Sequence, residues 1–268
     1  MSQALIVSAV AVLLYMTAVF LLALRLKDNS IVDIAWGPGF VLVASLSFFW
    51  EGAPTARHLL VTGLVAVWGT RLAVHIFLRK KGRGEDFRYA EWRRSWGKRF
   101  VPRSYFQVFF LQGLLLLLVA YPIIIINLSA VSPLRIWDGL GFLVWVLGFV
   151  FEVASDAQME RFRRDPTNKG KIIGTGLWRF SRHPNYFGEA TLWWGIFVIG
   201  LAVPRGWMGV LSPVLLTLLL TKVSGVPLLE KKYAGNPEFA AYARRTSVFI
   251  PWVPKRSPEA RPRAISEK

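Results

Sequence analysis

Three pairs of polar side chains interrupt the apolar stretches of this sequence, and the two members of each pair stand four residues apart. They are Arg71 with His75, Glu152 with Asp156, and Asn185 with Glu189. A spacing of four places both members on one face of a helix. An ionisable side chain costs about 2.5–3.5 kcal/mol at the centre of a membrane helix, so those that persist there are usually functional. All three pairs border a basic connection, which indicates a shared cavity filled by water or ligand, with interhelical ion pairs or the headgroup zone as the alternative.

The third pair belongs to the segment "WRFSRHPNYFGE", in which cations precede a polar helix start. Gly174, Gly176 and Pro184 break the chain here, so backbone amides and a helix N-terminus can face an anion such as a diphosphate. The surrounding cations are Lys171, Arg179, Arg182 and His183. Asn185 offers a donor and an acceptor, which suits a carboxamide or a ribose, and Glu189 one turn later can orient it. The sequence has no G-x-G-x-x-G fingerprint of a soluble dinucleotide-binding fold.

The elements that must position these residues are expected to be membrane helices. Of the 268 residues, 54% are hydrophobic, with 12 Trp and 19 Phe, which is more than a soluble core requires. Crossing a bilayer takes about 20 mostly apolar residues in a helix. The segments that qualify are 4–26, 31–50, 58–79, 105–126, 136–158, 185–203 and 207–229. The sequence therefore predicts an all-α integral membrane protein with seven transmembrane helices in one domain, 1–253, and a basic, disordered tail, 254–268.

Positive charge is distributed unevenly along the chain, whose formal net charge is +17. Most of the 33 Lys and Arg stand in alternate connections, chiefly 79–103, 161–182 and the stretch from Lys231 onward. By the positive-inside rule, this pattern places the N-terminus outside and the C-terminus in the cytoplasm. No nucleic-acid motif accompanies the charge, so topology and attraction to anionic lipid account for it. With no Cys and three widely separated His, a metal site is not expected.

Five motifs follow one another along the chain in an order that can be compared with known families. They are "SIVDIAWGPGF", "WGTRLAVHIFLR", "GEDFRY", "SRHPNYFGE" and "YARRTSVFIP". Together they resemble the steroid 5α-reductase family, and nearly the whole chain is similar to its bacterial membrane branch. The Arg-His-Pro-x-Tyr core is shared with isoprenylcysteine carboxyl methyltransferases and sterol C14/C7 reductases, whereas Asn185 and Glu189 favour the reductases. The resemblance implies an enzyme of the bacterial inner membrane whose cofactor site faces the cytoplasm.

The activity that this resemblance implies is NADPH-dependent reduction of the Δ4 double bond of a 3-ketosteroid, with hydride delivered to C5 and a proton to C4. The cofactor is expected in the C-terminal half, about 136–253. Matched motif by motif, its contacts are Asp156, Arg163, Lys171, His183, Asn185, Tyr186 and Glu189, with Arg88 and Tyr89 of "GEDFRY" as further contacts. The chain departs from mammalian relatives, which have Arg in place of Lys171, Asn in place of Glu152, and a His-rich run in the last span.

The implied reaction also needs a group that polarises the ketone as hydride arrives. An acid kept protonated by an apolar site, or a hydrogen-bonded Trp or Tyr, can do this. Asp33 of "VDIAWGPG" is the candidate, because it stands roughly where relatives place an acidic residue for the 3-ketone. Trp68 is expected to support it, and a contact with lipid is the alternative for this side chain.

Other functions remain open at this level. A SAM-dependent methyltransferase of a membrane-associated substrate would use the same Arg-His-Pro-x-Tyr loop. A reductase could instead act on another polycyclic enone or on a fatty enoyl group, and a seven-helix receptor or transporter also buries polar residues. The expected partners are an apolar enone and membrane lipid, without nucleic acid, and the chain is expected to be a monomer.

Overall fold

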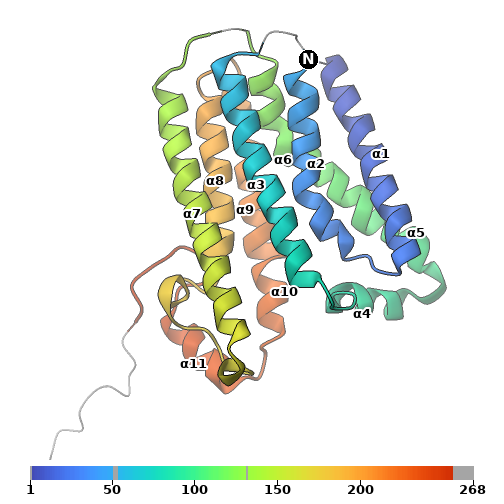
Figure 1. Cartoon of the computed structure of the whole chain (residues 1–268), viewed down its shortest axis with the longest axis vertical. Helices are drawn as coiled ribbons and strands as arrows, with labels where there is room; N and C mark the ends of the chain where they lie inside the picture. The colour runs from blue at the N-terminus through green and yellow to red at the C-terminus, as the bar shows by residue number, and fades with distance from the viewer. Residues whose placement is uncertain (1, 51–53, 131, 256–268) are drawn as a thin grey trace, which may run out of the picture. The chain divides into compact units, whose positions relative to one another are not determined.

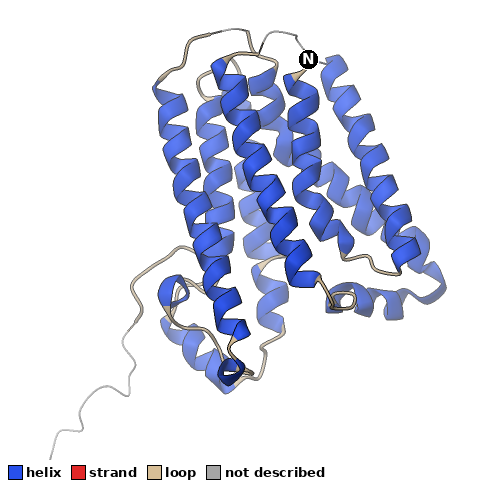
Figure 2. Cartoon of the chain, in the orientation of Figure 1, coloured by secondary structure: helices blue, strands red, loops and turns tan. Residues whose placement is uncertain are grey.

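Helices provide the regular structure of the residues that the computed structural model describes, which are 2–50, 54–130 and 132–255 (Figure 2). Within these ranges there is no β-strand, although Ser181 and Ser247 form an isolated parallel β-bridge. The all-α prediction is therefore confirmed. The tail predicted over 254–268 lies outside the described residues from position 256 onward.

The chain divides into two compact units. Unit 1 consists of Met1–Phe142 and Ile196–Pro213, and unit 2 consists of Leu143–Gly195 and Val214–Lys268. All three boundaries, after Phe142, Gly195 and Pro213, fall inside apolar helices, and the single domain expected over 1–253 stays a prediction. No shift in composition marks such a boundary.

Unit 1 contains the first helices of the chain (Figure 1). They are α1 (Ser2–Leu26), α2 (Ile31–Phe48), α3 (Ala56–Lys80), α4 (Phe87–Trp96), the 3-10 turn η1 (Gly97–Arg99), α5 (Phe100–Ser104), the π-helical η2 (Tyr105–Phe110) and α6 (Leu111–Asn127). The unit also includes the start of α7 (Ile136–Arg164), the end of α8 (Pro184–Gly200), η5 (Gly206–Val210) and the start of α9 (Leu211–Leu218).

Helix α2 is central to unit 1 because it packs against α1, α3 and α6. Its contact with α3 requires glycine. A Cβ atom on Gly37 would lie 2.2 Å from the Gly69 carbonyl oxygen, and a Cβ on Gly69 would lie 2.7 Å from the Gly37 oxygen. Small residues allow membrane helices to approach this closely. Asp33 stands one turn before Gly37 and Trp68 directly before Gly69, so this crossing fixes the segments that carry both predicted catalytic residues.

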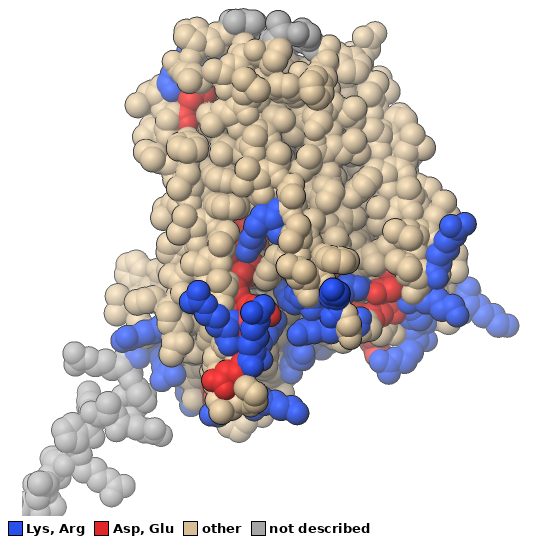
Figure 3. Space-filling model, viewed as in Figure 1, with Lys and Arg blue, Asp and Glu red and all other residues tan. Residues whose placement is uncertain are grey.

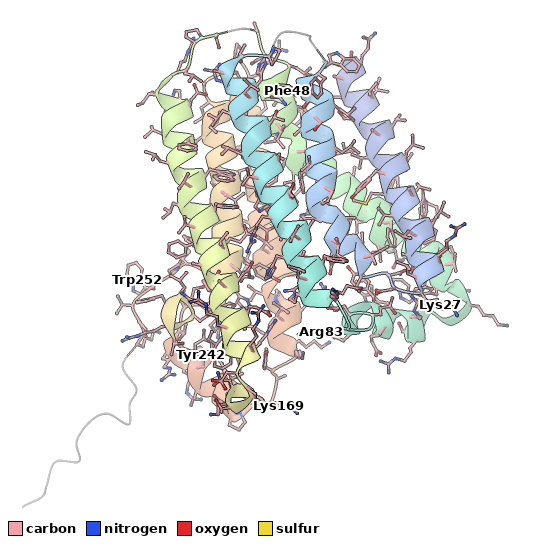
Figure 4. All side chains as sticks on the ribbon, viewed as in Figure 1. Lys27, Phe48, Arg83, Lys169, Tyr242 and Trp252 are labelled. Atoms are coloured by element: carbon pink, nitrogen blue, oxygen red, sulfur yellow. The ribbon has the colours of Figure 1, made fainter. Side chains whose placement is uncertain are left out.

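The two ends of unit 1 differ in their polar contacts, and Phe48 and Lys27 mark opposite ends of the unit (Figure 4). At the Phe48 end, Arg57 of α3 forms a bidentate ion pair with Asp138 of α7, with Nε–Oδ1 and Nη2–Oδ2 distances of 2.7 and 2.8 Å. The side chains are 1% and 3% exposed. Arg57 also donates to the Ser132 hydroxyl. This buried pair ties the start of α3 to the start of α7.

Several helices begin at side-chain caps, which explains where the chain turns. The Thr55 side chain accepts from the His58 amide while the His58 side chain accepts from the Thr55 amide, a reciprocal box that starts α3. Asp86 caps α4 by accepting from the Arg88 amide, and Asn236 caps the last helix of unit 2 in the same way.

Unit 2 begins at Leu143 inside α7 and contains the long loop before α8. Its further elements are η3 (Pro166–Asn168), η4 (Gly176–Arg179), the start of α8, the end of α9, the π-helical η6 (Leu219–Val223), α10 (Val226–Lys231) and α11 (Pro237–Arg245). Helices α7 and α8 cross at a second pair of glycines. A Cβ on Gly148 would lie 2.4 Å from the Leu192 nitrogen, and a Cβ on Gly188 would lie 2.5 Å from the Glu152 nitrogen.

Six helical segments of the described residues are long and apolar enough to cross a membrane. They are Ser2–Leu26, Ile31–Phe48, Ala56–Lys80, Phe87–Asn127, Ile136–Arg164 and Gly206–Lys231. The predicted span 185–203 corresponds to α8, which is only 17 residues long, whereas a span usually needs about 20. The predicted span 105–126 is part of a longer helical run that starts at Phe87 with α4. These apolar helices are those of a membrane protein.

Lys and Arg gather at one end of each unit (Figure 3). In unit 1 they surround α4 and the end of α3, and in unit 2 they surround α11 and the end of α7. This matches the basic connections that the sequence shows at 79–103 and 161–182. The orientation inferred from them, with the N-terminus outside, stays a prediction.

Candidate functional site

Asp33, Arg88 and Tyr89 form one cluster in unit 1. Arg88 Nη2 lies 2.8 Å from Asp33 Oδ2, and the Tyr89 hydroxyl donates to Asp33 Oδ1 at 2.8 Å. Asp33 belongs to the first turn of α2, and the other two belong to the first turn of α4. Tyr89 is 3% exposed. The sequence assigned Asp33 to catalysis and its two partners to the cofactor, and the structure brings the three side chains together.

Within this cluster, Asp33 is a hydrogen-bond acceptor at both carboxylate oxygens. Its donors are the Arg88 guanidinium and the Tyr89 hydroxyl, which can donate to one acceptor at a time, and the catalytic role of Asp33 stays a prediction. Arg88 also donates through Nε to Asp86 at 2.9 Å, so one guanidinium serves two carboxylates. Burial tends to raise the pKa of Asp86, but the hydrogen bonds and the positive charge of Arg88 lower that pKa below its ordinary value.

A second layer of polar contacts holds α4 against the start of α2. Arg93 donates to both oxygens of Glu85 at 2.9 Å, and Glu85 accepts from the Asn29 amide at 2.8 Å. The Asn29 side chain donates to the Ser104 hydroxyl at 2.9 Å. These contacts join the loop before α2 to the loop before α4, which are far apart in sequence. They fix the register in which Asp33 meets its two partners.

Trp68, the second predicted catalytic residue, is a core side chain of unit 1. It is 1% exposed, and its ring lies edge-on to Phe40 with centroids 5.5 Å apart. Burial to this degree argues against the alternative of a lipid contact. The contacts described for Trp68 are those of packing, and its role in chemistry stays a prediction.

In unit 2, Asp156 of α7 and Asn185 of α8 lie across the glycine crossing from each other. Asn185 Nδ2 donates to Asp156 Oδ1 at 3.3 Å. Asp156 is 8% exposed, and the nearby carboxylates Glu152 and Glu189 are 2% and 9% exposed. The sequence placed Asp156, Asn185 and Glu189 at one cofactor site. The structure puts all three on the two helices that cross at Gly148 and Gly188.

His183 and Tyr186 open α8 as a stacked pair. Their rings are 5.6 Å apart and inclined by 6°. His183 is 6% exposed, and its Nε2 lies 3.1 Å from Glu230 Oε1. The same carboxylate oxygen lies 3.1 Å from Arg182 Nε. His183 is thus held between Tyr186 and Glu230, which fixes its ring at the helix start.

The loop before α8 is folded by contacts within unit 2. The Leu177 amide donates to Gln158 Oε1 at 2.9 Å, and the Ile172 amide donates to Glu238. The Arg182 amide donates to the Ser247 carbonyl at 2.8 Å, which forms the isolated β-bridge. The sequence predicted that amides of this loop would face an anion. Those three amides bond within the chain, whereas anion binding by other amides of this loop stays a prediction.

Exposed cationic side chains stand on this loop and next to it. Lys171 and Arg179 are exposed, and Arg163 is exposed on the last turn of α7. Lys169 marks the loop in Figure 4. The types of side chain in unit 2 therefore suit a dinucleotide. The cations at the loop can bind phosphates, and the amide–carboxylate pair on the helices can bind a polar substituent of a ring.

Two residues that organise unit 2 were missed by sequence reasoning. Glu230 pairs with His183 and Arg182, and Tyr242 donates to the Trp178 carbonyl. Burial raises the pKa of Tyr242 well above its ordinary value, so this phenol stays a donor. Glu230 lies 47 positions from His183 in sequence, so no local pattern pairs the two. Its position as the acidic residue before Lys231 and Lys232 could have signalled it.

A shallow pocket of about 380 Å³ opens beside the Arg182–Glu230 pair. Tyr233 and Phe239 line it, with their rings stacked 5.0 Å apart at 20°. Such a wall can bind a planar ring. This pocket lies in unit 2, on the same Arg182–His183 segment that precedes α8.

Comparison with known proteins identifies a family whose model matches most of this chain. A family model described as "Protein of unknown function (DUF1295)" matches residues 19–246. An "Uncharacterized protein C594.04c" of Schizosaccharomyces pombe is 29% identical over 201 residues, which are 65% of this chain and 58% of that protein. A "Probable O-methyltransferase ustE" of Ustilaginoidea virens is 37% identical over 68 residues, 25% of this chain and 22% of that protein. This chain thus matches less than two thirds of either relative's length. No solved structure matches it.

Proposed function

Because this chain belongs to the DUF1295 family, which includes steroid 5-alpha-reductase-like membrane proteins, we propose that it reduces the carbon–carbon double bond of an apolar enone with NADPH. A Δ4-3-ketosteroid is the substrate class that the sequence motifs favour. In this proposal the cofactor site faces the cytoplasm.

The observation that carries the proposal is the Asp156–Asn185 pair of unit 2. One N–H of the Asn185 amide donates to Asp156, which fixes the amide plane. The oxygen and the second N–H of the Asn185 side-chain amide then keep fixed directions, and they can bind a carboxamide or a ribose. Glu189 lies one turn further along the same face of α8. The exposed cations Arg163 and Lys171 can bind phosphate groups, and Arg163 suits a 2′-phosphate.

NADPH would supply the hydride for this reaction. The chain must polarise the ketone, and a proton must reach the α-carbon after hydride reaches the β-carbon. The Tyr89 hydroxyl is the proton donor in the proposal, because it can turn from Asp33 to the ketone oxygen and protonate it as hydride arrives. The enol then takes a proton from water at its α-carbon and returns its hydroxyl proton to Tyr89. Asp33 orients the Tyr89 hydroxyl, and Arg88 balances the charge of Asp33. This assigns to Tyr89 the donor role that the sequence gave to Asp33.

The test is cofactor binding by the purified protein in detergent. We expect NADPH to raise the melting temperature more than NADH at equal concentration, because ligand binding to the folded state stabilises it. Arg163→Ala should weaken NADPH binding most. Progesterone with NADPH should then give a product heavier by two hydrogens, detected by mass spectrometry. Equal shifts with NADPH and NADH, or an unchanged steroid, would contradict the proposal.

A second candidate is a SAM-dependent methyltransferase, which two observations favour. One is the similarity to part of the probable O-methyltransferase. The other is the set of buried carboxylates Glu152, Asp156 and Glu189, since carboxylates attract the positive sulfonium of SAM. The same melting experiment separates the candidates. SAM should stabilise a methyltransferase, whereas NADPH alone should stabilise the reductase.

A further inference from the structure

The indole N–H of Trp145 in α7 is a buried donor with no acceptor among the described residues. Trp145 is 5% exposed. Trp178, in the same unit, provides the contrast, because its indole Nε1 donates to the Ser155 carbonyl at 3.0 Å. Buried N–H groups are nearly always paired, so an unused one calls for an explanation such as a ligand.

The ring of Trp145 is held in a fixed orientation. It stacks on Phe149 one turn later, with centroids 4.8 Å apart and planes inclined by 13°. The stack restrains the ring, so the N–H keeps one direction. A fixed donor without a protein partner is a suitable arrangement for recognising one oxygen of a ligand.

The face of α7 that carries Trp145 is the one that carries the candidate cofactor residues. Glu152 and Asp156 follow Trp145 by seven and eleven residues, so each lies within about 20° of it around the helix axis at 100° per residue. Asp156 on this face accepts from Asn185 of α8. Along the axis, Trp145 is about 16 Å from Asp156, at 1.5 Å per residue. The unused donor therefore lies deeper in the apolar part of unit 2 than the amide–carboxylate pair.

We propose that the Trp145 indole N–H binds a second oxygen of the substrate, at the end remote from the double bond that is reduced. This inference rests on the proposed function, because that function places an apolar enone next to the cofactor residues. The acceptor is a ketone or hydroxyl oxygen. Substrates that carry such an oxygen are preferred over those that end in hydrocarbon.

Two steroids with the same ring system test this. Androst-4-ene-3,17-dione has an oxygen at the remote end, and androst-4-en-3-one lacks it. Their binding to the wild type and to variants is measured by ligand-induced thermal stabilisation at several concentrations, in the presence of NADPH. We expect the wild type to bind the dione about five- to tenfold more tightly, the effect of one hydrogen bond.

The variant Trp145→Phe removes the N–H and keeps an aromatic ring. It should melt within a few degrees of the wild type without ligand, since no hydrogen bond of the protein is lost, and it should bind the two steroids equally. Trp178→Phe is the matched control. It should melt at a lower temperature, because the Ser155 carbonyl loses its donor, and it should keep the preference for the dione.

The two proposals fail separately. If Trp145→Phe keeps the full preference, or the wild type shows none, the role of Trp145 is overturned even when NADPH is consumed with both steroids. If the preference is present and lost in Trp145→Phe while neither steroid is reduced, Trp145 is a ligand donor and the reductase proposal fails. If neither steroid binds to the wild type, the inference is overturned as well.

Discussion

The ion pair between Arg57 and Asp138 gives a sharp test of what holds unit 1 together. Replacing Arg57 with Ala removes both bonds to the carboxylate of Asp138, at 2.7 and 2.8 Å, from a side chain that is 3% exposed in the wild type. The Arg135 amide remains as a donor to this carboxylate. Breaking a buried ion pair by removing one partner costs about 3–5 kcal/mol, since it leaves an uncompensated charge. We expect Arg57→Ala to lower the free energy of unfolding by that amount.

The assay is reversible unfolding of the purified protein in mixed detergent micelles, followed by circular dichroism. Two variants provide controls. Arg94→Ala removes an exposed Arg whose carboxylate partner is 3.6 Å away, so it should change stability by less than about 0.5 kcal/mol. The double variant Arg57→Met with Asp138→Leu replaces both charges and should recover most of the lost stability. A loss below about 1 kcal/mol for Arg57→Ala would refute the reasoning.

Four further outcomes follow from the site and its supports. Tyr89→Phe should still bind NADPH but reduce the enone about 100-fold more slowly, because the proton donor is lost, and an unchanged rate would exclude it as that donor. Asn185→Ala should lower kcat/KM by a factor corresponding to about 2–4 kcal/mol, with the fold checked by melting temperature. Gly188→Ala would place a methyl group 2.5 Å from the Glu152 nitrogen, so we expect a loss of about 1–3 kcal/mol in an unfolding titration. Burial tends to raise the pKa of Asp28, but hydrogen bonds from Lys80 and Ser30 lower this pKa below its ordinary value of 3.8. The contribution of Asp28 to stability is therefore present above pH 3.8 and is lost as the pH falls further. Asp28→Asn should flatten the acid limb of a profile of stability against pH.

Much of the helical architecture could be predicted from sequence because apolar runs of span length have few other solutions in a membrane. Each expected span overlaps helix within the described residues, and six of the helical segments there are long and apolar enough to cross a membrane. The bounds that were wrong have local causes. The run from Phe87 begins well before the expected 105, since α4 is polar on average and its arginines lower the apparent hydrophobicity. The predicted span 207–229 is interrupted by a π-turn at Lys222 and by Gly225 and Pro227.

The candidate site was predictable in its residue types but not in its pairings. The i,i+4 rule placed Asn185 and Glu189 on one helix face from spacing alone. The contact of Asp33 with Tyr89 joins residues that are 56 positions apart, and no local pattern encodes it. The use of the Leu177 amide by Gln158 could not be foreseen either, because a loop sequence does not show which side chains fold back on it. Pairing across a membrane fold depends on helix order and crossing, which periodicity leaves open.

The way the two units interleave along the chain bears on biogenesis. Unit 1 is completed only when Ile196–Pro213 has been synthesised, and these residues follow the first segment of unit 2. Unit 2 in turn closes late, since the amide of Trp252 donates to the Phe180 carbonyl and Ser247 bonds the Arg182 amide. The hydrogen bonds that hold the loop before α8 can therefore form only after about seventy more residues have been synthesised. A chain that ends before Ser247 has early helices that can insert into the membrane, but its loop before α8 lacks the hydrogen bonds to Ser247 and Trp252.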